Sequence, residues 1–195
     1  MVETARLRGE RPHAEHAAMY AELLGNAEVA AWLFPPPVGG GPRTHEQAAD
    51  WLAGDIDHWD QAGFGVWVFF ESESESFVGR GGLRRIEICG RPTVEVALAL
   101  LPETWGRGYA SEMASKAVEA ARALGLAEVC GLTLPTNIAS QRALEKAGLG
   151  HEREVEHAGL RHWFGRLALA SPAPPAQGTV QSGEITPLSN KRGSA

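Results

Sequence analysis

The segment Val94-Glu-Val-Ala-Leu-Ala-Leu-Leu-Pro-Glu-Thr-Trp-Gly-Arg-Gly-Tyr-Ala-Ser-Glu112 joins an apolar run, a glycine-rich stretch and the start of a helical pattern. Within Thr93 to Leu101, Glu95 is the only charged residue, which is typical of a strand that is covered on both faces. Gly106 and Gly108 allow a positive φ and let a ligand approach the backbone closely. Amide N–H groups that converge at the start of the following helix would form a site for a diphosphate.

Three other interpretations of this glycine-rich stretch can be weighed from the residues alone. A tight strand-to-helix turn without a ligand needs the same two glycines and stays open. A P-loop needs a lysine directly after its last glycine, and Tyr109 stands there. A dinucleotide-binding fingerprint needs a third glycine where Ser111 stands, and an acidic residue at the end of the next strand, which reads Thr133-Leu-Pro135. The pattern therefore disfavours both nucleotide-binding folds.

Working outward from this segment, the chain predicts a mixed α/β (α+β) domain with a mostly antiparallel sheet and one parallel βαβ unit in its second half. Strands are expected over residues 4–9, 65–70, 77–83, 93–101, 128–134, 151–156 and 162–170, and helices over residues 14–24, 28–34, 45–61, 111–124 and 138–147. Thr44 and Gln47 form a capping box, and Asn137 can cap a further helix. The stretch from Pro35 to Pro42 must be a loop. The run Glu71-Ser-Glu-Ser-Glu-Ser76 is interpreted as the solvated tip of a hairpin.

Length and composition suit one soluble domain with a tail. The chain has 195 residues, of which 44% are hydrophobic and 22% are charged, enough to bury one core. Residues 1–170 are expected to form the domain, and residues 171–195, which lack apolar periodicity, a disordered tail. A net charge of -6 argues against extensive electrostatic binding to the phosphates of a nucleic acid.

The two cysteines and the apolar runs bear on compartment and metal binding. Cys89 and Cys130 stand alone, so buried reduced thiols are expected rather than a disulfide or a metal site. The start of the chain shows no secretory leader, and no apolar run is long enough to span a bilayer. The sequence therefore predicts a cytoplasmic protein with no membrane partner and no metal.

Two motifs in this order resemble the GNAT N-acetyltransferases. The segment from Val94 to Glu112 is similar to the acetyl-coenzyme A motif of that family. The segment Leu134-Pro-Thr-Asn-Ile-Ala-Ser-Gln-Arg-Ala-Leu-Glu-Lys-Ala-Gly-Leu149 resembles its second motif. Residues 63–67 and 77–83 also resemble the branch that acetylates the N-termini of ribosomal proteins. The resemblance spans residues 4–170 and implies a sheet that splays apart between the strands over 93–101 and 128–134.

The resemblance also implies how acetyl-coenzyme A would bind as the cosubstrate. Its pantetheine arm would lie in the splayed gap and pair with backbone groups as an added strand does. A backbone N–H near Leu98 or Leu100 would stabilise the oxyanion of the thioester. Asn137 would bond the pantetheine arm, and Ser140 would lie near the sulfur. The diphosphate would rest on a loop packed by Trp105, on the amides of Gly106, Arg107, Gly108, Tyr109 and Ala110.

Direct transfer needs a base, because a protonated amine has no lone pair with which to attack. Glu95, the only carboxylate on the central strand, is the candidate, and a salt-bridged glutamate without a catalytic role is the alternative. His157 and His162 are the next candidates for the base. Leu144 stands where many relatives carry a tyrosine acid, so Ser140 is the candidate that protonates the departing thiolate. Alternatively, Ser140 only bonds the backbone near the start of its helix.

These expectations describe an N-acetyltransferase in which a primary amine attacks acetyl-coenzyme A directly in a ternary complex. The amine would belong to a protein or peptide N-terminus or to a small molecule, and Trp32, Phe34 or Trp59 would line its pocket. No covalent enzyme intermediate is expected, since neither cysteine has an activating neighbour. A non-catalytic acyl-coenzyme A binding or sensing module is the alternative. A homodimer is common among relatives, and the assembly of this chain stays open.

Overall fold

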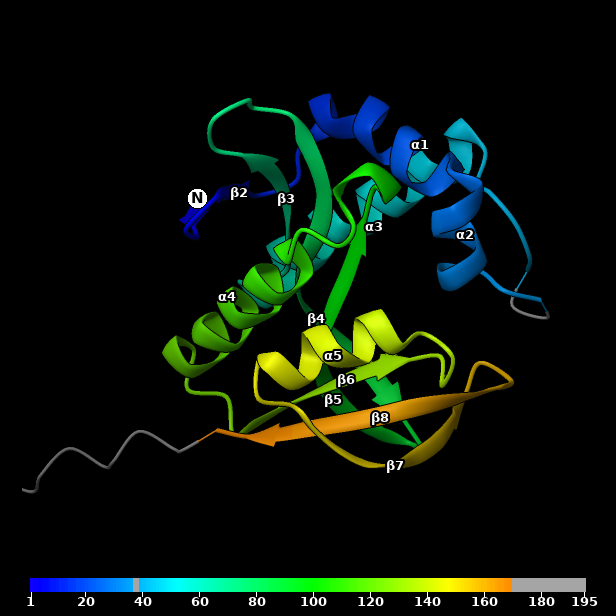
Figure 1. The fold of residues 1–195 in the computed structure, drawn as a ribbon, viewed down its shortest axis with the longest axis vertical. Helices are drawn as coiled ribbons and strands as arrows, with labels where there is room; N and C mark the ends of the chain where they lie inside the picture. Colours follow the sequence, from blue (N-terminus) through cyan, green and yellow to red (C-terminus); the bar gives the residue numbers. More distant parts are fainter. Residues whose placement is uncertain (37–38, 170–195) are drawn as a thin grey trace, which may run out of the picture.

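The computed structural model describes residues 1–36 and 39–169, which form one eight-stranded sheet with helices on both faces (Figure 1). The elements in chain order are β1 (Val2–Glu3), β2 (Leu7–Glu10), the 3-10 turn η1 (Ala14–His16), α1 (Ala17–Gly25), α2 (Ala27–Leu33), α3 (His45–Ala62), β3 (Val66–Glu71), β4 (Phe77–Ile88), β5 (Arg91–Leu100), the 3-10 turn η2 (Pro102–Thr104), α4 (Tyr109–Ala123), β6 (Glu128–Thr133), α5 (Ile138–Lys146), β7 (Gly150–His157) and β8 (Leu160–Ala168). The predicted tail over residues 171–195 lies outside the described residues. None of the described helices combines the length and the apolar character that a membrane span requires.

The predicted strands and helices are confirmed, most of them with boundaries shifted by one to three residues, and three of these differences have a clear physical reason. The strand expected from Thr4 begins at Leu7, because the Thr4 N–H donates to the Leu7 carbonyl at 2.9 Å and turns the chain between β1 and β2. The second hairpin strand continues past Leu83 to Ile88, since its charged half pairs fully with β5. Helix α4 begins at Tyr109, two residues before the expected start, because Gly108 with φ 84° is its N-cap.

The sheet has the strand order β1-β2-β3-β4-β5-β6-β8-β7 and is antiparallel except between β5 and β6. Those two strands are the predicted parallel unit, joined by α4. In the described part of the chain, Glu95 and Cys130 are the one residue pair that joins β5 to β6. Beyond this pair the two strands separate, which confirms the expected splayed sheet.

The backbone of β5 leaves hydrogen-bonding groups directed into this gap. The Leu101 N–H donates to the Val78 carbonyl at 2.9 Å, so the backbone hydrogen-bonding groups of Leu101 are directed toward β4. The Ala99 carbonyl is also directed toward β4, since a Cβ at Gly79 would lie 2.2 Å from its oxygen. Successive residues of a strand alternate between their two neighbours. Leu98 and Leu100 therefore direct their N–H and C=O groups toward the gap.

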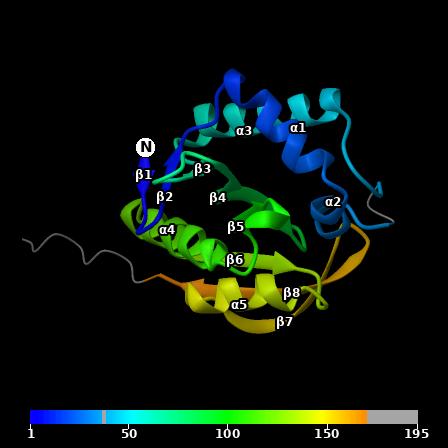
Figure 2. The same ribbon diagram turned by 45° about the horizontal axis from the view of Figure 1, so that its top comes forward.

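Two core layers hold the sheet between the helices. Val68 and Phe70 of β3 pack in a cluster with α1, α2 and α3. Trp67 and Phe69, which alternate with them, pack on the opposite face with Tyr109 and other residues of α4. Figure 2 shows α1 and α3 on one side of this part of the sheet and α4 on the other. The alternation of β3 thus fixes which helices cover which face.

A buried polar network ties α1 and α3 to β4. Asp55 Oδ2 accepts hydrogen bonds from the Tyr20 hydroxyl and from Arg80 Nη1, both at 2.6 Å. Arg80 is 4% exposed and Asp55 is 7% exposed. Burial raises the pKa of Tyr20 far above its ordinary value, so the phenol stays protonated and donates. The ion pair with Asp55 compensates the charge of Arg80, whose Nε has no hydrogen-bond partner among the described residues.

Candidate functional site

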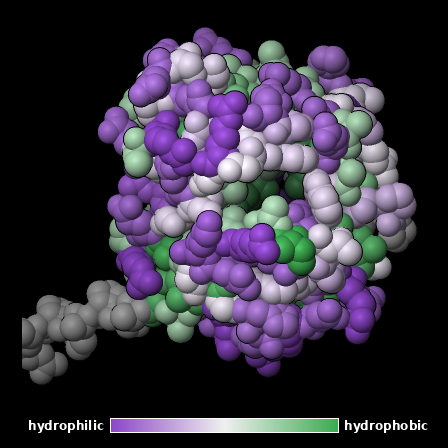
Figure 3. All heavy atoms as spheres, in the orientation of Figure 1, coloured by the Kyte–Doolittle hydropathy of each residue, from purple (hydrophilic) through white to green (hydrophobic). Residues whose placement is uncertain are grey.

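A cleft of about 780 Å³ opens where β5 and β6 part. Figure 3 shows a hollow in this region of the molecule, with hydrophobic atoms deep inside it. The walls come from β5, the loop before α4, β6, α5, and the end of the β7–β8 hairpin. The cleft brings together most of the residues predicted from the sequence: Glu95, Leu98, Leu100, Trp105, Gly106, Gly108, Tyr109, Ala110, Asn137 and Ser140.

The glycine-rich loop presents a row of free amides at one end of the cleft. In the described residues, the N–H groups of Gly106, Arg107, Gly108, Tyr109 and Ala110 have no hydrogen-bond acceptor. The first bonded amide of α4 belongs to Ser111, which donates to the Gly108 carbonyl at 3.1 Å. The positive end of the helix dipole adds to the partial charges of these amides. The arrangement is a ready-made anion site.

The conformation of this loop is determined by two glycines and by a hydrogen bond from the Trp105 side chain. Gly106 and Gly108 have φ values of 74° and 84°, a region that strains residues with a Cβ. The Trp105 indole N–H donates to the Leu100 carbonyl at 2.8 Å and so fastens the loop to β5. This bond occupies the Leu100 carbonyl and leaves the Leu98 N–H, the Leu98 carbonyl and the Leu100 N–H directed into the gap.

The larger side chains of the loop are held by Glu71, at the end of β3. Glu71 Oε1 lies 3.0 Å from Arg107 Nη1 and accepts from the Tyr109 hydroxyl at 2.5 Å. The Tyr109 hydrogen bond holds the pKa of Glu71 below its ordinary value, and the same bond raises the pKa of Tyr109. The expectation of a solvated hairpin tip is therefore wrong for Glu71, which ends β3 and reaches the loop. No local pattern of the run indicates this contact.

Glu95 lies in the cleft wall and is paired with Arg84. Glu95 is 7% exposed, and its Oε2 accepts from Arg84 Nη2 at 2.8 Å. The two residues stand directly opposite each other in the β4–β5 ladder. The Glu95 carboxylate raises the pKa of Arg84, so the guanidinium is permanently charged. Arg84 was missed from the sequence because it lies beyond the predicted end of its strand.

The second motif forms the wall made by α5. Asn137 Oδ1 accepts from the Ser140 N–H at 3.1 Å and caps the helix, as the sequence predicted. Both side chains also line the cleft. Leu144 is 1% exposed and packs in the core, so its side chain does not reach the cleft as a proton donor. Ser140 is the residue of α5 that brings a hydroxyl to the cleft.

Aromatic residues of α2 and α3 and the β7–β8 hairpin line another part of the cleft. Trp32 is 39% exposed there, and Phe34 and Trp51 pack edge to face with ring centroids 5.0 Å apart. His157 and His162 also line the cleft. The expectation for Trp59 is wrong: this side chain lies outside the cleft and donates to the Val66 carbonyl at 2.6 Å, which holds α3 against β3.

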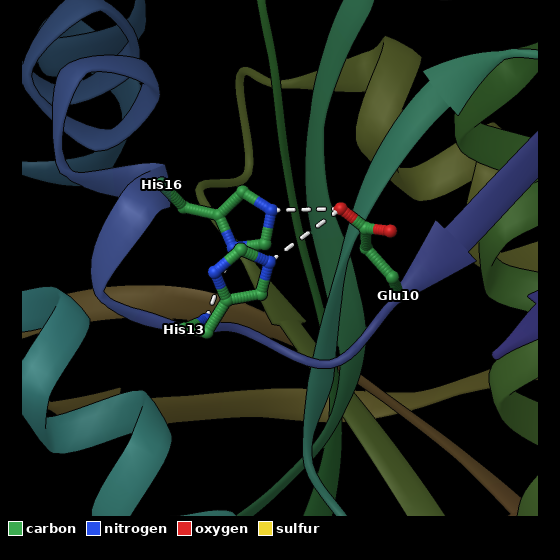
Figure 4. Close-up of side chains that lie close together, drawn as sticks. All are labelled: Glu10, His13 and His16. Atoms are coloured by element: carbon green, nitrogen blue, oxygen red, sulfur yellow. Dashed lines mark hydrogen bonds and ion pairs between the residues drawn. The ribbon is translucent and has the colours of Figure 1, made fainter.

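One cluster in the described residues has the composition of a metal site, namely Glu10, His13 and His16 (Figure 4). His16 Nδ1 accepts from the His13 backbone N–H at 3.0 Å, and His16 Nε2 lies 2.9 Å from Glu10 Oε1. Because Nδ1 needs its lone pair for that amide, Nε2 carries the proton and donates to Glu10. A cation would need the lone pair at Nε2, so the cluster fits a hydrogen-bonded cap on η1 better than a metal site.

Comparisons with known proteins agree with this arrangement. Residues 6–150 match the family model described as the acetyltransferase (GNAT) domain. The FsC-acetyl coenzyme A-N(2)-transacetylase of Aspergillus fumigatus is 40% identical over an alignment of 160 residues that covers 77% of this chain. The chain spans 65% of the length of that relative.

Solved structures share the fold at low sequence identity. The spermidine N-acetyltransferase from Vibrio cholerae, solved with CoA and spermine, has a TM-score of 0.65 and 14% identity, with 83% of this chain and 95% of that chain covered. The ribosomal-protein-S5-alanine acetyltransferase from Vibrio fischeri has a TM-score of 0.65 and 16% identity, with 86% of this chain and 95% of that chain covered.

Proposed function

Because the chain belongs to the GNAT acetyltransferase family, we propose that it transfers an acetyl group from acetyl-coenzyme A to a primary amine. The amine would belong to a protein or peptide N-terminus or to a small molecule. The observation that carries the proposal is the row of free amides over residues 106–110, at the end of a cleft between two parting strands. The first N–H groups of any helix lack intrahelical acceptors, and here the amides of Gly106 and Arg107, which precede α4, extend that row.

The residues present fit acetyl-coenzyme A along the length of the cleft. The amides of residues 106–110 would hold the diphosphate, and the free groups of Leu98 and Leu100 would pair with the amides of the pantetheine arm. A remaining N–H on this strand would donate to the thioester oxygen and stabilise the charge that develops there. Asn137 keeps its side-chain NH2 for the pantetheine arm, since only its oxygen is used for capping.

Proton transfer is assigned to Glu95 and Ser140. Glu95 supplies the only carboxylate among the described residues of the cleft wall, and Arg84 fixes its position. It would take the proton from the incoming ammonium group, directly or through a water molecule, which frees the lone pair for attack. The Ser140 hydroxyl would donate a proton to the departing thiolate. His162 is the alternative base, since its Nδ1 donates to the Leu160 carbonyl at 3.1 Å and leaves Nε2 with a lone pair.

The charges of the cleft narrow the class of amine. Within residues 1–36 and 39–169, the wall carries one carboxylate, already paired, and four cationic side chains: Arg43, Arg84, Arg142 and Lys146. A polyamine would meet repulsion here, whereas a monoamine with an apolar body would pack on Trp32, Phe34 and Trp51. We therefore expect monoamines, including peptide N-termini, to be better acceptors than spermidine.

Binding and turnover together test the proposal. Acetyl-coenzyme A is titrated into the protein by calorimetry, and thiol release is then followed with peptides, aromatic monoamines and spermidine. Binding with turnover of a monoamine supports the proposal. Binding without turnover for any amine would favour the sensing module, and absence of binding would overturn both.

A pair of variants tests the base. Glu95→Gln is expected to lower kcat by about 100-fold or more, a typical loss for a general base, and to leave the Kd for acetyl-coenzyme A unchanged. Glu87→Gln, at an exposed position of β4, is the matched control. Unchanged kcat in Glu95→Gln would remove Glu95 as the base and leave the transferase assignment intact.

A further inference from the structure

The glycine-rich loop is built with its amides and its side chains on opposite sides. Five consecutive N–H groups have no acceptor in the part of the chain that the structure describes, yet the two long side chains in the same stretch are both bonded to Glu71. Arg107 does not line the cleft, and its guanidinium lies 3.0 Å from the Glu71 carboxylate. A cationic side chain could also bind a diphosphate directly, but the Arg107 guanidinium is bonded to Glu71 and holds the loop from the side opposite the cleft.

The carbonyl of Arg107 is fixed in the same way. Arg6 Nη2 donates to this carbonyl at 2.8 Å, and Arg6 Nε donates to Glu112 Oε1 at 2.6 Å. The Arg107 carbonyl and the Gly108 N–H belong to one planar trans peptide, so they point in opposite directions. With the carbonyl held by Arg6, the Gly108 N–H must point away from Arg6. The Gly108 amide, at the centre of the row, is thus oriented by a contact on the other side of its peptide.

Glu71 joins the two halves of this support. Arg107 and Tyr109 flank Gly108, and both reach the same oxygen of Glu71. Arg6 also lies over the Tyr109 ring, 4.6 Å from its centroid. Of the three glutamates in the run from Glu71 to Ser76, only Glu71 reaches the loop, and Glu73 is exposed. Glu71 therefore contacts the glycine-rich loop, and Glu73 in the same run does not, which makes Glu73 a matched control position.

We propose that Glu71 is a positioning residue for the cosubstrate: its carboxylate holds Arg107 and Tyr109 outward so that the amides of residues 106–110 face the cleft before the diphosphate arrives. This inference rests on the proposed function. A loop held in its binding conformation loses less entropy when the ligand binds, so the benefit appears as affinity for the diphosphate. The charge of Glu71 is compensated by Arg107 and by the Tyr109 hydroxyl, which limits its repulsion of an anion.

The test compares two acetyl donors in two variants. S-acetylpantetheine carries the thioester and lacks the diphosphate, so it does not use the amide row. Glu71→Gln is expected to raise the Kd and KM for acetyl-coenzyme A by about tenfold, the lower end for losing a hydrogen bond to a charged group. The kcat at saturation and the kcat/KM with S-acetylpantetheine are expected to stay at the values of the unmodified protein. Glu73→Gln is the matched control and is expected to leave the kinetic constants for both donors and the Kd for acetyl-coenzyme A unchanged.

Two other outcomes would contradict the positioning role of Glu71, and a third would contradict the proposed function. Equal Kd values for acetyl-coenzyme A in Glu71→Gln and Glu73→Gln would overturn the proposal. An equal loss with both donors would also overturn it, because it would show a general structural role. Arg107→Gln removes the other half of the contact. It must weaken the binding of acetyl-coenzyme A and leave kcat/KM with S-acetylpantetheine unchanged. Failure of the unmodified protein to bind acetyl-coenzyme A would instead overturn the proposed function, and this proposal with it.

Discussion

Removing Asp55 should destabilise the fold strongly, because it leaves a buried cation without its counter-charge. Arg80 is 4% exposed, its Nη1 lies 2.6 Å from Asp55 Oδ2, and its Nε already lacks a partner among the described residues. Breaking such a pair costs about 3–5 kcal/mol. Tyr20→Phe removes only one hydrogen bond to the same carboxylate and should cost about 1.5–3 kcal/mol.

The assay for Asp55 is thermal and urea unfolding, followed by circular dichroism. A loss of 3–5 kcal/mol corresponds to a fall in Tm of about 6–20 °C for a domain of this size. Asp57→Ala, at an exposed position of the same helix, is the control and should stay within about 0.5 kcal/mol. Replacing both partners, as in Asp55→Ala with Arg80→Met, should recover part of the loss. A loss for Asp55→Ala no larger than that for Asp57→Ala would refute the reasoning.

Three further predictions concern the loop and the thiols. Gly106→Ala meets no atom within 4 Å but places a Cβ at φ 74°, so strain of about 1–2 kcal/mol should raise the Kd for acetyl-coenzyme A by about 5- to 30-fold, and an unchanged Kd in calorimetry would contradict this. The expectation of a buried thiol is confirmed for Cys130 and wrong for Cys89, which lies exposed in the turn after β4. Because burial raises the pKa of Cys130 to about 12, an alkylating reagent should modify one thiol in the folded protein and two after denaturation. Rapid modification of both thiols in the folded state would contradict the buried position of Cys130. The folded pKa of Glu71 lies below its ordinary value of 4.5, so its support of acetyl-coenzyme A affinity is complete above that value and is lost as the pH falls through the lowered pKa; a loss of affinity that begins near neutral pH and is absent in Glu71→Gln would contradict this.

The parts of the fold that follow local rules could be predicted from the sequence. The capping box of Thr44 and Gln47 is present, with the Gln47 N–H donating to the Thr44 hydroxyl at 3.2 Å. Asn137 caps α5 in the same local way. The glycines at positions 106 and 108 adopt the positive φ that their place between strand and helix indicated. These features depend on residues three or four positions apart, which a linear pattern records.

The supporting contacts of the site could not be predicted, because they depend on how distant segments meet. Arg84 reaches Glu95 across a strand pair whose register the sequence does not state. Glu71 meets Arg107 through the packing of β3 beside the loop, 36 positions along the chain. The strand β4 continues through Arg84 and Glu87, which an apolar pattern would end at Leu83. Charged residues of this kind carry no periodic signal, so their partners appear only in the folded chain.

The central claim is that the main-chain amides of residues 106–110 bind the diphosphate of the cosubstrate. Nitrogen–proton correlation spectra of the assigned protein, recorded while acetyl-coenzyme A is added, test it most directly. The five amide signals should shift together and saturate with the calorimetric Kd, and inorganic pyrophosphate should move the same signals. Saturable binding of acetyl-coenzyme A that leaves these five signals in place would contradict the account.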